Sequence, residues 1–358
     1  MLAATPFVPA SQPDFHDHRL SAIIEDACER TRFVIDEAST GIQRVDDGCY
    51  FISGMYENRR AWLKISQTPT PENDPNLIET FNTKNLGSSV RMPKVLFYEP
   101  FERPWDFGIT VVEDTGGQSL IEEAMATRQQ MRTFADFYGD YRARSLMHPA
   151  GSLDPGNSVH FVIERLCSLR DACVKKGFLA RETFEPLLLD FIGEFAIDQL
   201  QFIPRVYSIV GLTAEHIKHK MQNGCKRYVI YTNFQWEWQP IWYDLAFNAA
   251  SVIMKAPERR ITTEQIMTYI DEWMIVYGAM PMAKDDRFFP VRIRLMLLFR
   301  FLSILMGEVG QSHELDRDKR RAERIGLVSA LRSLYQFYAN QTRQYARKLH
   351  AGVRWSNS

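Results

Sequence analysis

The sequence predicts an α+β protein of two lobes, a small β-rich lobe followed by a larger, mainly helical lobe. Short alternating or apolar runs separated by turn signals lie within residues 41–66, which is typical of a β-meander, and two further strand-like runs follow at 94–98 and 108–113. From residue 119 onward, apolar residues recur mostly at helical spacing. Between the two patterns lies Asp114-Thr115-Gly116-Gly117, which we interpret as a flexible joint. A chain of 358 residues is long enough to build two such lobes.

Composition and charge argue against several classes of protein. Hydrophobic residues make up 45% and charged residues 24% of the chain, as in an ordinary soluble globular protein. The formal net charge of −1 provides no field that would attract nucleic acid or an anionic membrane. The five cysteines show no CxxC spacing, which favours reduced thiols in a cytoplasm. The apolar stretch Ile293–Met306 is too short and too charged to span a bilayer. We therefore expect a cytoplasmic protein without nucleic-acid binding or membrane insertion.

Residues 1–40 are expected to form an N-terminal extension and a helix. The first fourteen residues are rich in Pro, Ala and Ser, and they lack the basic and apolar regions of a signal peptide. Leu20–Glu37 then has helical periodicity. Its apolar residues fall on or near one face: Ile23, Ile24, Ala27 and Phe33.

Residues 41–117 are expected to form the β-rich lobe. Its predicted strands are 41–45, 49–53, 61–66, 94–98 and 108–113, with a short helix over 74–86. Lys64 lies in the third strand between Leu63 and Ile65, and burying an unpaired ammonium is costly. Either Lys64 points outward on the polar face of the strand, which the pattern favours, or it meets an anion.

Residues 118–358 are expected to form the helical lobe, which contains a hairpin over 204–232. The predicted helices are 119–146, 158–176, 180–201, 243–254, 263–278, 288–308 and 315–349. The hairpin is predicted from two apolar runs, Val206–Ile209 and Tyr228–Thr232, with Asn223-Gly224 between them. An Asn-Gly pair is a strong signal for a tight β-turn.

This order of elements resembles the protein-kinase-like fold, and more narrowly the aminoglycoside phosphotransferase and choline kinase family. AWLKI looks like the strand whose lysine holds the α- and β-phosphates of ATP, which gives Lys64 that role. Glu79 is similar to the helix glutamate that pairs with this lysine. GITVVEDTGG resembles the linker whose backbone meets adenine, so Val112, Glu113 and Asp114 become candidate nucleotide contacts. The resemblance implies ATP and Mg²⁺ as cofactors.

The catalytic loop departs from the family pattern, which reads roughly His-Gly-Asp-Leu with Asn or His four residues later. Leu212 and His216 match this pattern, whereas Gly211 stands at the position of the catalytic aspartate. The metal-binding aspartate at the end of the hairpin corresponds to Asn233, before Phe234. His216 and Asn233 are thus the candidate metal ligands, both of them degenerate.

These replacements predict a pseudokinase of this family. A catalytic base typically contributes about 10²–10⁴ in rate, and Gly211 has no side chain to act as one. Mg²⁺ prefers carboxylate oxygens, whereas Asn233 brings no charge and His216 is a soft ligand. We expect the protein to act by binding a protein partner or a small-molecule ligand in the cleft between the lobes. Nucleotide binding can have been retained or lost.

Two alternatives remain open at this point. One is an active ATP-dependent small-molecule phosphotransferase, or another transferase on the same fold, with relocated acids. Glu215 and Glu237 are the candidates for such acids, although each is also typical of a surface or helix-start residue. The other alternative is a scaffold in which Lys64 and Glu79 form a structural ion pair. No GxGxxG or GxxxxGK[ST] phosphate-binding motif occurs in the chain.

Overall fold

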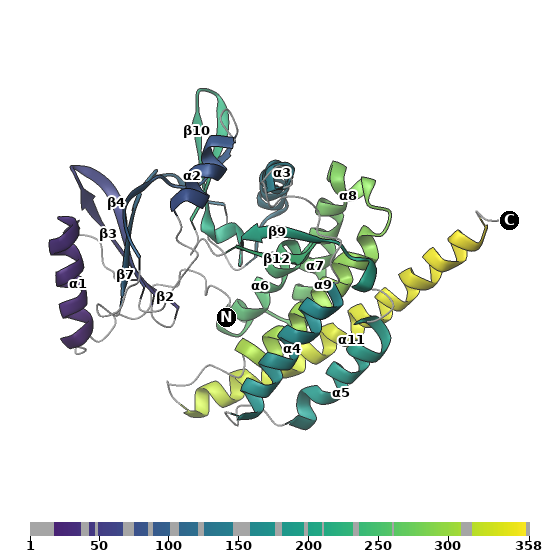
Figure 1. Cartoon of the computed structure of the whole chain (residues 1–358). Helices are drawn as coiled ribbons and strands as arrows, with labels where there is room; N and C mark the ends of the chain where they lie inside the picture. The colour runs from purple at the N-terminus through teal and green to yellow at the C-terminus, as the bar shows by residue number, and fades with distance from the viewer. Residues whose placement is uncertain are drawn as a thin grey trace. The chain divides into compact units, whose positions relative to one another are not determined.

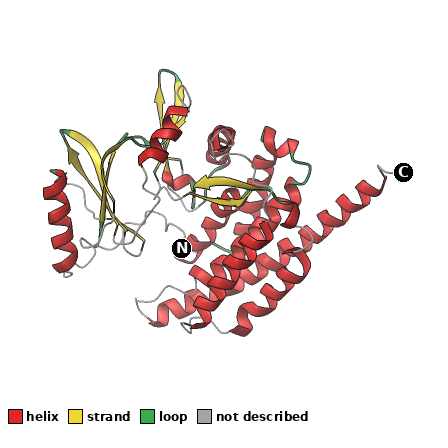
Figure 2. Ribbon diagram, viewed as in Figure 1, coloured by secondary structure: helices red, strands yellow, loops and turns green. Residues whose placement is uncertain are grey.

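The computed structural model places the chain in two compact units (Figure 1). The first unit comprises Met1–Glu122 and Ile209–Trp236, and the second comprises Glu123–Ser208 and Glu237–Ser358. The described residues are 18–36, 43–46, 49–66, 75–84, 89–100, 107–120, 125–145, 158–175, 181–196, 200–209, 211–231, 236–259, 261–308 and 317–355. Strands dominate the first unit and helices dominate the second, which confirms the predicted α+β class (Figure 2).

An antiparallel sheet forms the main part of the first unit. Its strand order is β1-β3-β4-β7-β6, and β2 pairs with β3. The strands are β1 (Val34–Ile35), β2 (Gln43–Asp46), β3 (Cys49–Tyr56), β4 (Arg59–Ser66), β6 (Val95–Glu99) and β7 (Gly108–Glu113). Glu57 and Asn58 connect β3 to β4 with positive φ angles of 47° and 61°. Such a primed two-residue turn matches the twist of the paired strands and fixes their register.

The helix α1 (His18–Thr31) packs its apolar face on this sheet. The shared core contains Ile23, Ile24, Ala27, Phe33, Ile52, Ala61, Leu63, Ile65, Phe107, Ile109 and Val111. The helix is shorter than expected, because Phe33 enters the core after its end and Val34–Ile35 pairs with β3. Gly54 permits this pairing, since a Cβ there would lie 2.2 Å from the Val34 carbonyl oxygen.

A second sheet in the first unit has the strand order β5-β11-β10-β8. These strands are β5 (Val90–Arg91), β8 (Gln118–Ser119), β10 (Ile217–Gln222) and β11 (Cys225–Ile230). Asn223-Gly224 forms the predicted turn, with φ angles of 52° and 76°. The prediction that Val206–Ile209 forms the first strand of this hairpin was wrong. A two-residue turn pairs the residues that directly flank it, so Ile217–Gln222 pairs with Cys225–Ile230.

Most helices of the second unit lie close to their predicted ranges, but α3 begins nine residues later than expected and α8 was not predicted. They are α3 (Arg128–Ser145), α4 (Ser158–Lys175), α5 (Arg181–Phe191), α6 (Tyr243–Arg259), α7 (Thr263–Gly278), α8 (Pro281–Asp285), α9 (Phe289–Ser303) and α11 (Arg317–Trp355). The run Val206–Ile209 belongs to β9 (Arg205–Ile209), which pairs with β12 (Trp236–Pro240). Nearly all of α9 is buried, and the Arg300 guanidinium lies 4.1 Å from the Phe247 ring centroid. Within the described ranges, no helix is long and apolar enough to cross a membrane.

Candidate functional site

Lys64 is buried in β4, opposite Phe51 of β3 and Thr110 of β7. Its relative exposure is 1%, so the interpretation that it points outward was wrong. The strand is covered on both faces, because Leu63 and Ile65 are buried as well. The Lys64 ammonium lies 5.7 Å from the Phe51 ring centroid, at the distance of a cation–π contact. The second interpretation, in which Lys64 meets an anion, stays a prediction.

Glu79 lies on α2 (Pro75–Lys84) and is exposed to solvent. The described contacts do not join its carboxylate to Lys64. The ion pair between these two residues therefore stays a prediction.

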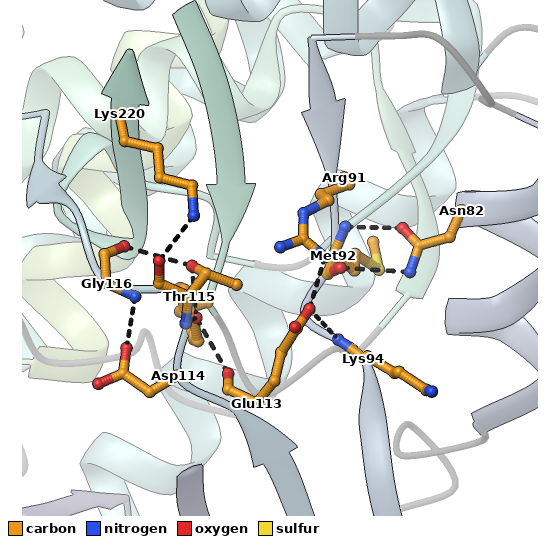
Figure 3. A network of polar contacts seen from close by, with 10 residues as sticks. Asn82, Arg91, Met92, Lys94, Glu113, Asp114, Thr115, Gly116 and Lys220 are labelled. Atoms are coloured by element: carbon orange, nitrogen blue, oxygen red, sulfur yellow. Dashed lines mark hydrogen bonds and ion pairs between the residues drawn. The ribbon is translucent and has the colours of Figure 1, made fainter. Parts of the chain in front are cut away.

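The acidic side chains of the candidate linker residues make contacts within the first unit (Figure 3). Val112 is buried. The Glu113 carboxylate accepts hydrogen bonds from the Arg91 side chain at 2.5 Å and the Lys94 backbone N–H at 2.8 Å. The Asp114 carboxylate accepts from the Gly116 N–H at 2.9 Å and forms an ion pair with Lys218 at 3.4 Å. These carboxylates therefore stabilise the linker itself, and nucleotide contacts at Val112, Glu113 and Asp114 stay a prediction.

Gly211 has a left-handed backbone with a φ of 68°, which glycine adopts without steric cost. The following segment forms a short helical turn, Ala214–His216. The His216 ring atom Nδ1 lies 3.3 Å from the Gly211 carbonyl oxygen and 3.3 Å from Thr213 Oγ1. Burial lowers the pKa of His216 to about 4, although the Gly211 carbonyl opposes the shift. The imidazole is therefore neutral near pH 7, and its contacts with Gly211 and Thr213 stabilise the loop.

The described loop does not suit Mg²⁺. Gly211 offers no side chain, and Nδ1 of the neutral His216 faces oxygen atoms of its own loop. In the part of the chain that the structure describes, no group of three His, Cys, Asp or Glu side chains could hold a metal ion. The other candidate ligand, Asn233, lies outside the described residues.

Of the two candidate replacement acids, Glu237 differs from a free catalytic base. Glu237 on β12 forms an ion pair with Arg165 of α4 at 3.0 Å. Glu215 is half-buried, and its backbone carbonyl accepts a hydrogen bond from Ser119 Oγ at 3.0 Å. The Glu237 pair therefore has a structural explanation.

Asp244, in the first turn of α6, is the centre of a buried polar cluster in the second unit. Its Oδ2 atom lies 3.0 Å from Arg142 and accepts a hydrogen bond from Ser208 Oγ at 2.8 Å. Tyr141 Oη lies 2.9 Å from the same Ser208 hydroxyl, and Arg142 Nε donates to Tyr138 Oη at 2.7 Å. Burial raises the pKa of Asp244, while Arg142 and Ser208 oppose the shift. Asp244 therefore has a structural role in the second unit.

Sequence reasoning missed Tyr231, which directly follows β11. Its hydroxyl lies 2.8 Å from the Thr115 backbone nitrogen and 3.1 Å from the Glu113 carbonyl oxygen. The residue was included in the apolar run Tyr228–Thr232 and was read only as strand. The available signal was an aromatic residue with a polar tip at the end of a strand, two residues before Asn233.

Comparison with protein-family models and with curated protein sequences finds no match. Solved structures of low sequence identity do share the fold. A thermostable mutant of aminoglycoside phosphotransferase APH(4)-Ia, in ternary complex with AMP-PNP and hygromycin B, matches with a TM-score of 0.53 and 11% identity, over 87% of this chain and 98% of that chain. The amicoumacin kinase hAmiN, in complex with AMP-PNP, Ca²⁺ and Ami, matches with a TM-score of 0.57 and 12% identity, over 88% and 94%. The GDP and kanamycin complex of APH(2")-IIia matches with a TM-score of 0.53 and 13% identity, over 88% and 98%. The chain therefore has the protein-kinase-like fold of aminoglycoside phosphotransferases and related small-molecule kinases.

Proposed function

We propose that this protein is a pseudokinase of the aminoglycoside phosphotransferase type, which acts by binding and does not transfer phosphate. The observation that carries the proposal is the loop around Gly211. Gly211, with a left-handed backbone, lies at the position that the family resemblance assigns to a carboxylate base. The His216 imidazole in the same loop is neutral and contacts the Gly211 carbonyl oxygen. Such a loop keeps its shape without a group that can accept the proton of a substrate hydroxyl.

The place of Lys64 in the fold motivates the proposal that an anion is still bound. Lys64 is buried in β4, the strand that resembles the phosphate-binding strand of the family. Structural neighbours were crystallised with AMP-PNP, and one of them also with Ca²⁺. By analogy we propose the phosphates of a nucleotide as the anion at Lys64, with Val112, Glu113 and Asp114 near the base. We further propose a small molecule or a protein as the second ligand, because the neighbours bind hygromycin B, Ami or kanamycin.

The dependence of nucleotide binding on metal tests this proposal. An ordinary kinase holds its nucleotide partly through Mg²⁺ fixed by acidic side chains. We expect the thermal stabilisation by AMP-PNP to be the same with Mg²⁺, with Mn²⁺ and with EDTA, and to decrease in Lys64→Met. A larger stabilisation with either metal, abolished by Glu215→Gln, would contradict the proposal and favour relocated acids. Glu237→Gln serves as the matched control, since Glu237 is held by Arg165.

A further inference from the structure

Two backbone groups of the linker meet at one side chain. We define the linker as residues 113–117. The Thr115 backbone N–H donates to Tyr231 Oη at 2.8 Å, and Tyr231 Oη donates to the Glu113 carbonyl at 3.1 Å. The Thr115 hydroxyl also lies 2.8 Å from Tyr231 Oη. One phenol therefore satisfies a carbonyl and the N–H two residues farther along the linker.

Tyr231 is firmly held in this position. Its backbone N–H donates to the His216 carbonyl at 2.6 Å. The Lys218 ammonium lies 4.8 Å from the Tyr231 ring centroid and 5.4 Å from that of Trp62. The same ammonium forms an ion pair with Asp114 of the linker. Burial raises the pKa of Tyr231 to about 12, so the phenol keeps its proton and remains a hydrogen-bond donor near neutral pH.

Other polar groups of the linker also have partners within the first unit. The Glu113 N–H donates to the Lys94 carbonyl at 2.9 Å, and Lys220 Nζ donates to the Thr115 carbonyl at 3.0 Å (Figure 3). Gly117 approaches β10 so closely that a Cβ there would lie 2.7 Å from the His219 carbonyl oxygen. The Glu113 carbonyl and the Thr115 N–H, in contrast, share one side chain, Tyr231, as their hydrogen-bond partner. Rotation of that side chain would expose both groups together.

The exposed pair would complement one edge of adenine. A carbonyl followed by an N–H two residues later can accept from the exocyclic amino group and donate to the adjacent ring nitrogen. The phenol hydroxyl supplies the same donor and acceptor from one oxygen atom. Hypoxanthine presents the reverse pattern, a carbonyl beside an N–H, and does not fit this pair of groups.

We propose that Tyr231 occupies the adenine-recognition edge of the linker in the free protein, and that an adenine nucleoside binds only when it displaces the Tyr231 hydroxyl. This inference rests on the proposed binding function and adds a gate to it. The apparent affinity for the base is then reduced by the fraction of molecules in which Tyr231 is displaced.

Adenosine is the appropriate probe, because it carries no phosphate and needs neither Lys64 nor metal. We expect Tyr231→Ala to bind adenosine about tenfold more tightly than the wild type by isothermal titration calorimetry, since two hydrogen bonds no longer have to be broken. Tyr231→Phe should show a smaller gain in the same direction, and inosine should gain nothing. Tyr335→Phe is the matched control, because it removes a tyrosine hydroxyl that is bonded to Asp190 in the second unit. Unchanged adenosine affinity in folded Tyr231→Ala and Tyr231→Phe would overturn the proposal.

Hydrogen exchange at the Thr115 amide provides a second readout, which remains decisive if Tyr231→Ala does not fold. This amide should exchange about tenfold faster in Tyr231→Phe than in the wild type, and saturating adenosine should restore its protection. Exchange that is equally slow in both proteins would contradict the gate.

These experiments distinguish failure of the Tyr231 gate from failure of the proposed pseudokinase function. Detection of phosphate transfer would overturn the pseudokinase proposal and leave the Tyr231 gate standing. Unchanged adenosine affinity would remove the gate and leave the absence of catalysis untouched.

Discussion

The buried cluster around Asp244 and the loop around Gly211 use polar groups in opposite ways. In the cluster, the Asp244 carboxylate is bonded to Arg142 and Ser208. In the loop, Gly211 has no side chain, and the His216 imidazole that contacts its carbonyl oxygen is neutral. Both regions are buried, so both must satisfy their polar groups internally. The difference is that the cluster neutralises a buried charge with a partner of opposite charge, whereas the loop contains a buried histidine without charge.

The largest expected effect comes from removing the carboxylate of the cluster. Asp244→Ala leaves the Arg142 guanidinium buried without its ion-pair partner, which should lower the free energy of unfolding by about 3–5 kcal/mol. Guanidinium denaturation followed by circular dichroism measures the loss. Glu237→Ala is the matched control, because its partner Arg165 is partly exposed and the loss should be about 1 kcal/mol or less. Equal losses in the two variants would show that complete burial does not make the Arg142–Asp244 pair more important to stability than the partly exposed Arg165–Glu237 pair.

A smaller effect is expected from the neutral histidine of the loop. The pKa of His216 is about 4 in the folded protein, against 6.5 for an ordinary histidine, so the unfolded chain binds more protons between these values. The resulting stability is fully present above pH 6.5 and is lost as the pH falls toward 4. We expect this contribution to be about 3 kcal/mol, from the size of the shift. Denaturation curves of the wild type and His216→Gln across this range measure the difference.

His219→Gln is the control for the loss of an imidazole as such, since His219 lies on β10 and is only partly buried. A His216→Gln variant that keeps the full pH dependence would show that His216 is not the titrating group.

The smallest effect is expected at Gly211. Gly211→Ala places a Cβ on a residue with a φ of 68°, which should cost about 1–2 kcal/mol. Gly326→Ala is the contrasting control, because Gly326 lies in α11 with open space around its Cβ position and should gain about 0.5–1 kcal/mol. Thermal denaturation of the two variants should therefore shift in opposite directions. A loss at Gly326 equal to that at Gly211 would refute the backbone explanation.

The regular elements were largely predictable from sequence because their signals are local. Helical periodicity places α4 and α7 within a residue or so of their observed ends, and Asn223-Gly224 marks its turn correctly. The burial of Lys64 was not predictable from its strand, because alternation along one strand does not show that both faces are covered. The role of Tyr231 depends on a contact with residues more than a hundred positions earlier in the chain, which no local pattern contains.

The candidate site was likewise predictable from sequence only in part. The identity of Gly211 is read directly from the sequence, whereas the neutrality of His216 follows from burial and from the Gly211 and Thr213 oxygen atoms around it. Glu237 was a plausible acid until its pairing with Arg165 was seen. The sequence therefore identifies the residues of the loop, and the structure shows which contacts their described groups make.

Transfer of the γ-phosphate from radiolabelled ATP, with Mg²⁺ or Mn²⁺ and a panel of hydroxylated acceptors that includes hygromycin B and kanamycin, tests the central claim most directly. The wild type should transfer no more phosphate than Lys64→Ala does. Transfer by the wild type that Lys64→Ala abolishes would contradict the claim that the loop around Gly211 has lost its chemistry.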